Sequence, residues 1–349
     1  MEKTDLENGD QKKSGAKKPG ALIAVIVCAA LILGITGYDF FISRSSSEST
    51  TIAMGTVIKL KLSGSDSAES IETVKENIEE TEKSLLSRNV AYSDIGRINS
   101  SAGLAVYVSQ ETADFISQAL EVSSYCPGFD VTVGRISKLW NFDGESQSVP
   151  SDDEIKALLT SVGFNRVKVS GNSVTIGKDQ ALDLGAIGKG AACDRIRNVL
   201  KGTKTKSAVI SVGGSLLLYG KKKYSIGIVN PLNDKEYMAT LRLSDTCVST
   251  SGNYEKSFEK GGVTYHHILD ARTGYPVRSK LSGVTVICDS GAVSDALSTA
   301  CYILDYNGSS ELLKKYDAEA VFVYSDKSVR ITDGIKDRFE ITDDSYKVV

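Results

Sequence analysis

The stretch LDLGAIGKGAACD, residues 182–194, contains three glycines and one lysine where the predicted secondary structure changes from strand to helix. Free backbone N–H groups and the positive end of the helix dipole favour a phosphate there, and Lys189 adds a positive charge. The spacing differs from that of a Walker A loop, which also requires a serine or threonine directly after the lysine. A strand-to-helix turn with a surface lysine explains the same residues, so the stretch alone favours neither interpretation.

Helices and strands surround this stretch without strict alternation. Helices are predicted over residues 71–85, 111–125, 152–161, 188–200, 292–304 and 310–317. Strands are predicted over residues 51–62, 166–171, 173–177, 207–220, 224–230, 238–243, 263–270, 282–289, 320–324 and 328–333. This order is typical of an α+β fold with a mixed, largely antiparallel sheet and flanking helices. Because no repeat or linker follows residue 51, we expect one domain over residues 51–349.

The N-terminal region has a different composition. Residues 1–18 are polar and end in four lysines, whereas residues 19–38 carry no charge and are long enough to cross a bilayer as a helix. Basic residues before such a helix favour an orientation that places the rest of the chain outside the cytoplasm. We therefore expect a cytoplasmic basic tail (1–18), a transmembrane anchor (19–38) and a Ser-rich tether (39–50), so the protein would be a single-pass membrane protein. A cleaved signal peptide is the alternative.

Charge and composition exclude several classes of function. The chain has 41 basic and 44 acidic residues, a net charge of -3, and so lacks the basic surplus typical of nucleic-acid binders. Its two histidines are adjacent and no Cys-x-x-Cys pair occurs, which argues against a multi-histidine zinc site. The cysteines after residue 38 are irregularly spaced, so buried free thiols are expected, although one pair could still form a disulfide.

Two further motifs carry groups suited to catalysis. In DALST, Asp295 and Thr299 lie four residues apart on one helix face, where their oxygens could bind Mg²⁺ or could merely stabilise the helix. In YHHILDARTGYP, His266 and His267 are placed on one strand and therefore face opposite sides, so a cleft would use only one of them. A catalytic base with an ordinary histidine pKa would make the rate rise between about pH 6 and 7.5.

Three segments carry weaker signals. The aromatic residues Phe129, Trp140 and Phe142 could border a flat ligand, but such residues more often form core. AMGT (53–56) and VSTSGNYE (248–255) are predicted to be small-residue turns at which backbone could approach a ligand closely.

The order of these motifs is more specific than any one of them. AMGT, SRN (87–89) with SDIGRIN (93–99), GFDVTVGRISKLWNF (128–142), LDLGAIGKGAACD, ISVGGSLL (210–217), VSTSGNYE, HHILDARTGYP (266–276) and SDALSTA (294–300) together resemble the ApbE family of FAD:protein FMN transferases. The resemblance implies a single α+β domain that binds FAD in a cleft. It also implies Mg²⁺-dependent transfer of FMN from FAD to a threonine hydroxyl of an acceptor flavoprotein, with release of AMP.

The resemblance assigns roles residue by residue. The metal ligands would be the backbone oxygen of Ala186 and the side chains of Asp295 and Thr299. His267 and Asp295 are the alternative catalytic bases. The FAD cleft would be formed by Met54, Gly128, Phe129, Asp130, Lys189, Ser251, Gly252 and His267. At Asn89 many members of the family carry an aromatic residue, so a contact with the flavin or adenine ring could be missing.

Two other functions are compatible with the same residues. One is a Mg²⁺-dependent FAD pyrophosphatase that releases FMN and AMP, and the other is a non-catalytic FAD-binding protein on the cell surface. The retention of Asp295 and Thr299 argues against the second of these. For a transferase, the resemblance implies as partner an acceptor protein with an FMN-binding domain that carries the target threonine.

Overall fold

The structure, a computed structural model, describes residues 46–142, 144 and 147–349. The predicted basic tail, the predicted anchor and residues 39–45 of the predicted tether lie outside this part of the chain. Within it, no helix is both long and apolar enough to span a bilayer. The folded unit begins at Ser46, five residues before the predicted domain boundary.

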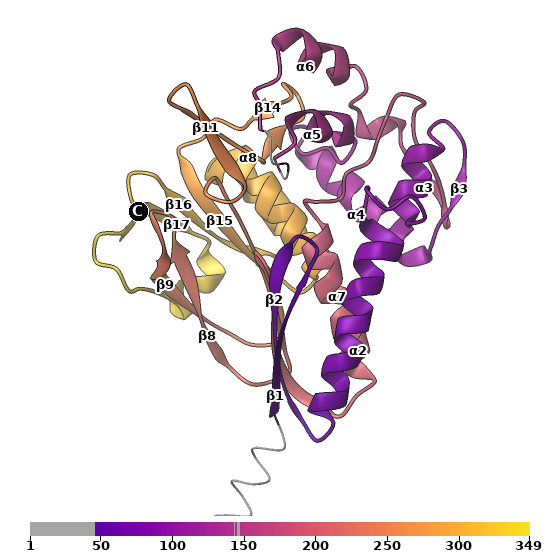
Figure 1. Cartoon of the computed structure of the whole chain (residues 1–349). Coiled ribbons are helices and arrows are strands. Elements are labelled where there is room, and N and C mark those ends of the chain that lie inside the picture. Colours follow the sequence, from indigo (N-terminus) through magenta and orange to yellow (C-terminus); the bar gives the residue numbers. More distant parts are fainter. Residues whose placement is uncertain (1–45, 143, 145–146) are drawn as a thin grey trace, which may run out of the picture. The chain divides into compact units, whose positions relative to one another are not determined.

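A nine-stranded sheet forms the centre of this unit (Figure 1). All neighbouring strands in it are antiparallel except the last pair, β17 and β19, which confirms the mixed, largely antiparallel sheet. In spatial order its strands are β1 (Ser46–Ala53), β2 (Thr56–Gly64), β6 (Thr205–Val212), β7 (Ser215–Tyr219), β10 (Thr246–Gly252), β15 (Leu281–Cys288), β16 (Glu319–Tyr324), β17 (Ser328–Ile331) and β19 (Lys347–Val348).

Layers of structure cover both faces of this sheet. On one face lie the helices α2 (Ser67–Glu80), α7 (Gly188–Lys201) and α8 (Gly291–Lys315) (Figure 1). On the other face lies a three-stranded sheet, whose apolar side chains share a core with those of the main sheet. The strands of the small sheet are β8 (Tyr224–Asn230), β9 (Asn233–Leu243) and β18 (Phe339–Ile341). Because both faces are covered, every residue of β15 is buried.

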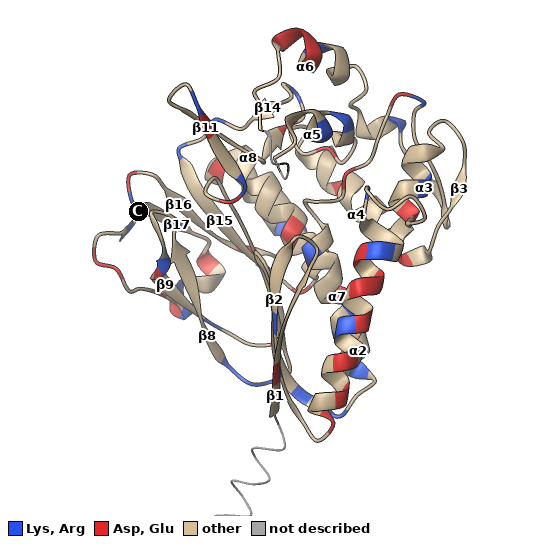
Figure 2. Ribbon diagram, viewed as in Figure 1, with Lys and Arg blue, Asp and Glu red and all other residues tan. Residues whose placement is uncertain are grey.

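The outer helix α2 shows why these segments fold as they do. Ile71, Val74 and Ile78 recur at helical spacing and are buried, whereas the outward face carries acidic and basic side chains (Figure 2). In the strand β2, burial alternates from one residue to the next: Leu60 and Leu62 are buried on either side of exposed Lys61.

The remaining elements surround this framework. The helical ones are η1, a π-helical turn (Thr81–Leu86), α3 (Asp94–Ser100), α4 (Gln110–Tyr125), α5 (Gly134–Trp140), α6 (Asp152–Leu159) and the 3-10 turns η2 (Phe164–Arg166) and η3 (Asp333–Arg338). The short strands are β3 (Val106–Tyr107), β4 (Lys168–Ser170), β5 (Ser173–Thr175), β11 (Ser257–Lys260), β12 (Val263–His266), β13 (Leu269–Asp270) and β14 (Tyr275–Pro276). All helices expected from the sequence are present.

The strand predicted over residues 51–62 is in fact a hairpin that includes part of the predicted tether. Ser46 to Ala53 pair continuously with β2, and Met54 and Gly55 make the turn with φ values of 53° and 67°. The Ser-rich composition suggested a tether, but backbone pairing with a neighbouring strand does not require apolar side chains.

Four other local predictions are wrong. The strand predicted over 207–220 is a hairpin, because β6 and β7 pair with each other across the turn at Gly213 and Gly214. The strand predicted over 263–270 is interrupted, because β12 ends at His266 and β13 begins only at Leu269. The segment VSTSG, predicted as a turn, is the central strand β10, whose small side chains fit beneath α8. The residues before α7, predicted as a strand end, contribute only an isolated bridge between Ala181 and Val133.

Candidate functional site

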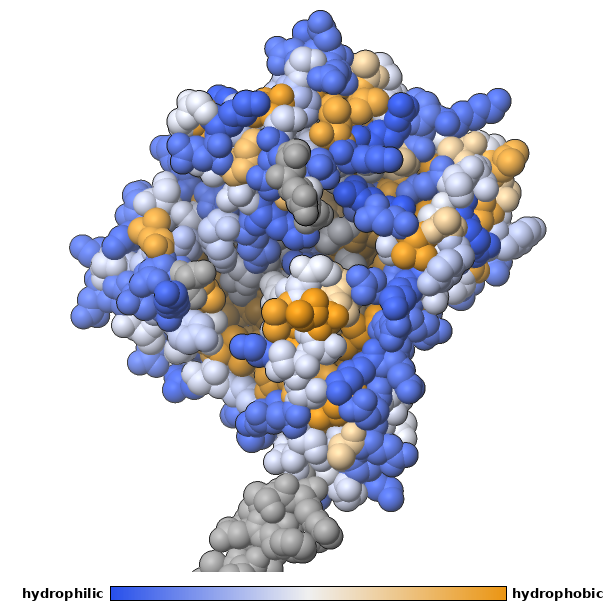
Figure 3. Space-filling model, viewed as in Figure 1, coloured by the Kyte–Doolittle hydropathy of each residue, from blue (hydrophilic) through white to orange (hydrophobic). Residues whose placement is uncertain are grey.

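A cavity of 920 Å³ opens where the ends of several elements converge. The turn between β1 and β2 forms one wall, and the start of α7 and the first turns of α8 form the floor. The tip of that hairpin exposes 80% of Ile52 and 48% of Val57, and Figure 3 shows this apolar patch beside the hollowed surface. The size is within the range of small-molecule and cofactor sites.

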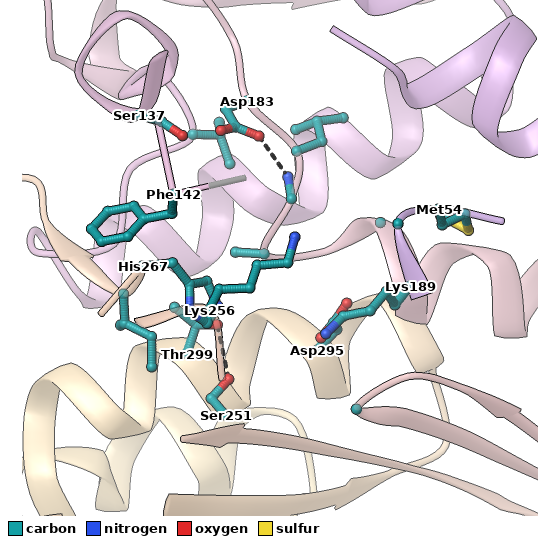
Figure 4. Close-up of a pocket in the computed structure, with 18 of the residues that line it drawn as sticks. Met54, Ser137, Phe142, Asp183, Lys189, Ser251, Lys256, His267, Asp295 and Thr299 are labelled. Atoms are coloured by element: carbon teal, nitrogen blue, oxygen red, sulfur yellow. Dashed lines mark hydrogen bonds between the residues drawn. The ribbon is translucent and has the colours of Figure 1, made fainter. Parts of the chain in front are cut away.

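The N-terminal ends of α7 and α8 meet at the floor of the cavity. A Cβ atom placed on Gly190 would lie 1.9 Å from the carbonyl oxygen of Gly291, so only glycine allows this approach. Asp295 is 3% exposed and accepts a hydrogen bond from the Gly190 N–H at 3.0 Å. Figure 4 shows Lys189 beside Asp295.

This contact lies close to Ala186, which comes just before α7 and also lines the cavity. Gly190 is in the first turn of α7, where backbone N–H groups have no acceptor within the helix, and its N–H donates to Asp295 instead. Ala186, the buried carboxyl group of Asp295 and Thr299 therefore line one space.

Hydroxyl groups hold α8 against β10. Ser249 bonds to Ser294 at 2.7 Å, and Ser251 bonds to Ser298 at 2.7 Å. Ser251 also bonds to Thr299 at 3.1 Å (Figure 4). These contacts fix the face of α8 that carries the predicted metal ligands.

The electrostatics of the floor are set by burial. Desolvation raises the pKa of the Asp295 carboxyl, and the positive charge of Lys189 partly offsets this effect. The Nζ atom of Lys189 also lies 4.0 Å from a carboxylate oxygen of Glu255. A carboxylate that is buried this deeply would be stabilised in its ionised form by a further cation.

The two histidines have different surroundings, as expected, although only His266 lies in a strand. His267 lines the cavity, and its buried Nδ1 atom has no hydrogen-bond partner among the described residues. His266 is buried outside the cavity lining, where its Nε2 atom donates to the carbonyl oxygen of Val277 at 2.9 Å.

Burial also changes the acidity of His267. Desolvation, followed by the charges of Lys189 and Lys256, lowers the pKa of His267 to about 4. This pKa is below the ordinary histidine value on which the rate profile between pH 6 and 7.5 was based.

The structure brings most predicted site residues together. The nine that line the cavity are Met54, Phe129, Asp130, Ala186, Lys189, Ser251, His267, Asp295 and Thr299. Asn89, at the position where many members of the family carry an aromatic residue, also lines it. Asp130 also has a structural role, because its carboxylate accepts hydrogen bonds from Thr132 and from the Phe164 N–H.

Two predicted residues do not line the cavity. Gly128 packs against Ile303, whose Cγ2 atom would lie 2.7 Å from an added Cβ, and Gly252 packs in the same way against the ring of Tyr254. Trp140 is also core: it is fully buried, stacks on Phe142 and donates to the carbonyl oxygen of Gly274 at 2.8 Å.

Several cavity residues were missed by the site prediction. Arg88 donates to Ser137 at 2.8 Å and to Asp183 at 2.5 Å, which makes a charged pair on the wall opposite the floor. Glu255 and Lys256 come from the segment that follows β10. Arg88 lies in SRN and Glu255 lies in VSTSGNYE, but neither residue was singled out within its motif until the fold placed it at the cavity.

Comparisons with known proteins agree with this geometry. The model of the "ApbE family" matches residues 54–322. The chain belongs to the ApbE family. A curated relative from Treponema pallidum, "FAD:protein FMN transferase", is 31% identical over 92% of this chain and 96% of the relative. A relative with the same description from Klebsiella pneumoniae is 32% identical over 86% of this chain and 96% of its own length.

Solved structures of the ApbE family share the fold. The "apbe protein" of Thermotoga maritima superposes with a TM-score of 0.76 at 29% identity, covering 83% of this chain and 98% of that protein. The "flavinyl transferase ApbE" of Pseudomonas stutzeri gives a TM-score of 0.74 at 26% identity, covering 84% of this chain and 96% of its own.

Proposed function

We propose that this protein transfers FMN from FAD to a threonine hydroxyl of an acceptor flavoprotein, with release of AMP, in a Mg²⁺-dependent reaction. The observation that carries the proposal is the junction of α7 and α8, which presents oxygen ligands and Lys189 on the floor of one cavity. Relatives described as FAD:protein FMN transferases, matched over nearly their whole length, support the choice of reaction.

The residues on the floor fit a magnesium ion. Its ligands would be the Ala186 carbonyl oxygen, the Asp295 carboxylate and the Thr299 hydroxyl, all of them hard oxygen donors. Ala186 lines the cavity just before α7, and a cation would stabilise the ionised form of the buried Asp295 carboxylate. When bound, Mg²⁺ would neutralise charge on the diphosphate of FAD.

In the proposed group transfer, one phosphorus–oxygen bond forms and another breaks. The threonine oxygen forms a bond to the phosphorus of the FMN half, the bond from that phosphorus to the bridging oxygen breaks, and that oxygen leaves with AMP. Lys189 and the N–H groups at the start of α7 would bind the diphosphate and balance its charge.

The proton of the threonine needs an acceptor, and we favour His267 over Asp295. At neutral pH His267 is uncharged, because burial and nearby lysines keep its pKa low, and its Nδ1 atom has no partner among the described residues. Asp295 already accepts a hydrogen bond from Gly190 and is assigned to the metal. The negative diphosphate would raise the pKa of His267 and make it a better base.

The decisive test is the product. The purified chain is incubated with FAD, Mg²⁺ and an FMN-binding domain that carries a threonine, and the acceptor is then denatured and analysed by mass spectrometry. A mass increase equal to FMN minus water, lost with EDTA, is expected. AMP and free FMN without labelled protein would instead identify a pyrophosphatase, and FAD binding without turnover would identify a carrier.

We also propose that residues 19–38 anchor the protein in the membrane, with the catalytic domain outside the cytoplasm. The uncharged segment and the preceding lysines support this orientation. All five cysteines of the described part, Cys126, Cys193, Cys247, Cys288 and Cys301, are buried free thiols, so the fold needs no disulfide even in an oxidising compartment.

A further inference from the structure

A second cavity, of 460 Å³, adjoins the site on the other side of the turn between β6 and β7. Its lining includes five consecutive residues of β8, Ser225 to Val229. Successive side chains of a strand point to opposite faces, so five in a row can line one cavity only if the edge of the strand faces it. The cavity is therefore a groove that includes the edge of β8, and Tyr237 and Leu241 of β9 also line it.

That edge of β8 is unpaired within the described part of the chain. The small sheet has the order β18-β9-β8, so β8 bonds to β9 on one side and has no strand on the other. Free N–H and C=O groups on an edge strand can bind an extended peptide as an additional strand. Figure 3 shows the surface hollowed on the side of the β1–β2 hairpin that faces β8 and β9.

The groove leads directly to the proposed reaction centre. Four residues line both cavities: Gly213, Gly214, Thr250 and Glu255. A Cβ atom on Gly214 would lie 3.3 Å from the Nζ atom of Lys189, so a group that reaches Gly214 from the groove is next to the lysine on the floor of the site.

The chemistry of the lining limits what can bind. Leu216, Ile226 and Val248 offer apolar contacts, Ser211, Thr250 and Thr285 offer hydroxyls, and Glu255 is the one charged residue in the lining that the structure describes. An uncharged, extended segment with small or apolar side chains fits this surface better than a nucleotide, whose phosphates would meet no cation along β8.

We propose that this groove binds the segment of the acceptor protein that contains the target threonine, as a strand added to the edge of β8. The segment runs along β8 and passes Gly213 and Gly214, which brings its threonine hydroxyl to Lys189 and Asp295. The proposal rests on the proposed transferase function. In this arrangement the diphosphate and the hydroxyl would approach the floor from different sides.

Ser225 provides the test, because it is the exposed residue of β8 in the lining and its replacement leaves the core untouched. Ser225→Trp should block the groove, and Ser225→Arg should fill it with a charged side chain. Ser170→Trp is the matched control, since Ser170 is an exposed strand residue of β4 outside both cavities. Circular dichroism and urea unfolding check that all variants fold.

The experiment uses an acceptor domain that the wild-type chain labels with FMN. Both Ser225 variants should raise the KM for the acceptor at least about tenfold, with the KM for FAD unchanged, whereas Ser170→Trp should behave as wild type. Unchanged acceptor KM in both Ser225 variants overturns the groove proposal and leaves the transferase intact. Failure of the wild-type chain to label any threonine-bearing domain overturns the transferase, and the groove proposal with it.

Discussion

Asp194 and Asp295 each accept hydrogen bonds from the backbone of the helix that carries the other. Asp194 of α7 accepts from the N–H groups of Gly291 and Ala292, at 2.6 and 2.9 Å, at the start of α8. Asp295 of α8 accepts from the N–H group of Gly190 near the start of α7. Each carboxylate thus satisfies donors that its partner helix cannot satisfy itself, and together they fix the position of the proposed metal ligands.

Asp194→Asn should weaken this junction. The substitution keeps the size of the side chain. It replaces the carboxylate, whose two oxygens accept hydrogen bonds from Ser290, Gly291 and Ala292, by an uncharged amide with only one accepting oxygen. We expect the free energy of unfolding to fall by ~1–3 kcal/mol and the Mg²⁺ concentration for half-maximal activity to rise. Urea unfolding and a Mg²⁺ titration measure the two effects. The exposed Asp114→Asn on α4 is the control and should change neither.

Gly190→Ala should separate the two helices. Its methyl group would lie 1.9 Å from the Gly291 carbonyl oxygen, and backbone at this position cannot move without shifting α8. We expect a loss of about 3 kcal/mol or more in the free energy of unfolding. Gly202→Ala, at the end of the same helix, meets its nearest atom at 3.4 Å and should be nearly neutral. Equal stability of the two variants would show that the junction is looser than the structure indicates.

Much of the site could be predicted from the sequence, because its motifs are short and local. Lys189, Asp295 and Thr299 lie in segments whose helical structure the sequence indicates, and all three line the same cavity. The largely antiparallel sheet also followed from the pattern of strands. Local periodicity is sufficient for such assignments, since it depends on neighbouring residues only.

Other features depend on contacts between distant segments and could not be predicted. The low pKa of His267 results from burial and from Lys189, 78 residues away in the chain. The pairing of Arg88 with Asp183 and the free edge of β8 likewise arise only when separate parts of the chain pack together. The strand β10 was predicted as a turn because it is rich in small residues. In the structure these small residues allow it to pack closely beneath α8.

Removal of the carboxylate should abolish the metal site while the fold survives. Asp295→Asn retains an oxygen for the Gly190 N–H but loses the ionised ligand, so FMN transfer should fall by ~10²–10³-fold. Thr299→Ala should do less, because water can replace a neutral hydroxyl on Mg²⁺. Initial rates against Mg²⁺ concentration distinguish the variants. Full activity of the wild type in EDTA would contradict the assignment of these ligands.

The N-terminal assignment leads to a prediction about the chain boundaries. The full chain should fractionate with membranes, whereas a chain that begins at Ser46 should remain in the supernatant and transfer FMN. A chain that begins at Thr51 lacks five residues of β1 and should unfold at a lower urea concentration, because β2 loses most of its partner. Recovery of the native protein from cells as a shortened soluble species would show that residues 19–38 are a cleaved signal.

The two histidines should make the protein less stable as the pH falls below about 6.5, which is above the range in which most carboxylates titrate. Burial lowers the pKa of His266 and brings that of His267 to about 4, so both are uncharged in the folded protein, while the unfolded chain binds protons near pH 6.5. Their contribution to stability is complete above about pH 6.5 and is lost as the pH falls toward the folded pKa. Between pH 7.5 and 5, His267 should account for a loss of about 2 kcal/mol.

His267→Gln should remove that part of the pH dependence. Urea unfolding of the wild type and of His267→Gln, in EDTA at several pH values between 7.5 and 5, gives the difference between their free energies of unfolding. The raised pKa of Asp295 changes stability with pH in the opposite direction, but it is present in both proteins. Because His266 remains, the variant should keep part of the slope, and the double variant His266→Gln, His267→Gln should lose the contribution of both histidines and keep only the opposite effect of Asp295. Identical slopes for wild type and His267→Gln would mean that His267 titrates normally when folded. The transfer rate should then rise between about pH 6 and 7.5, as an ordinary histidine base requires.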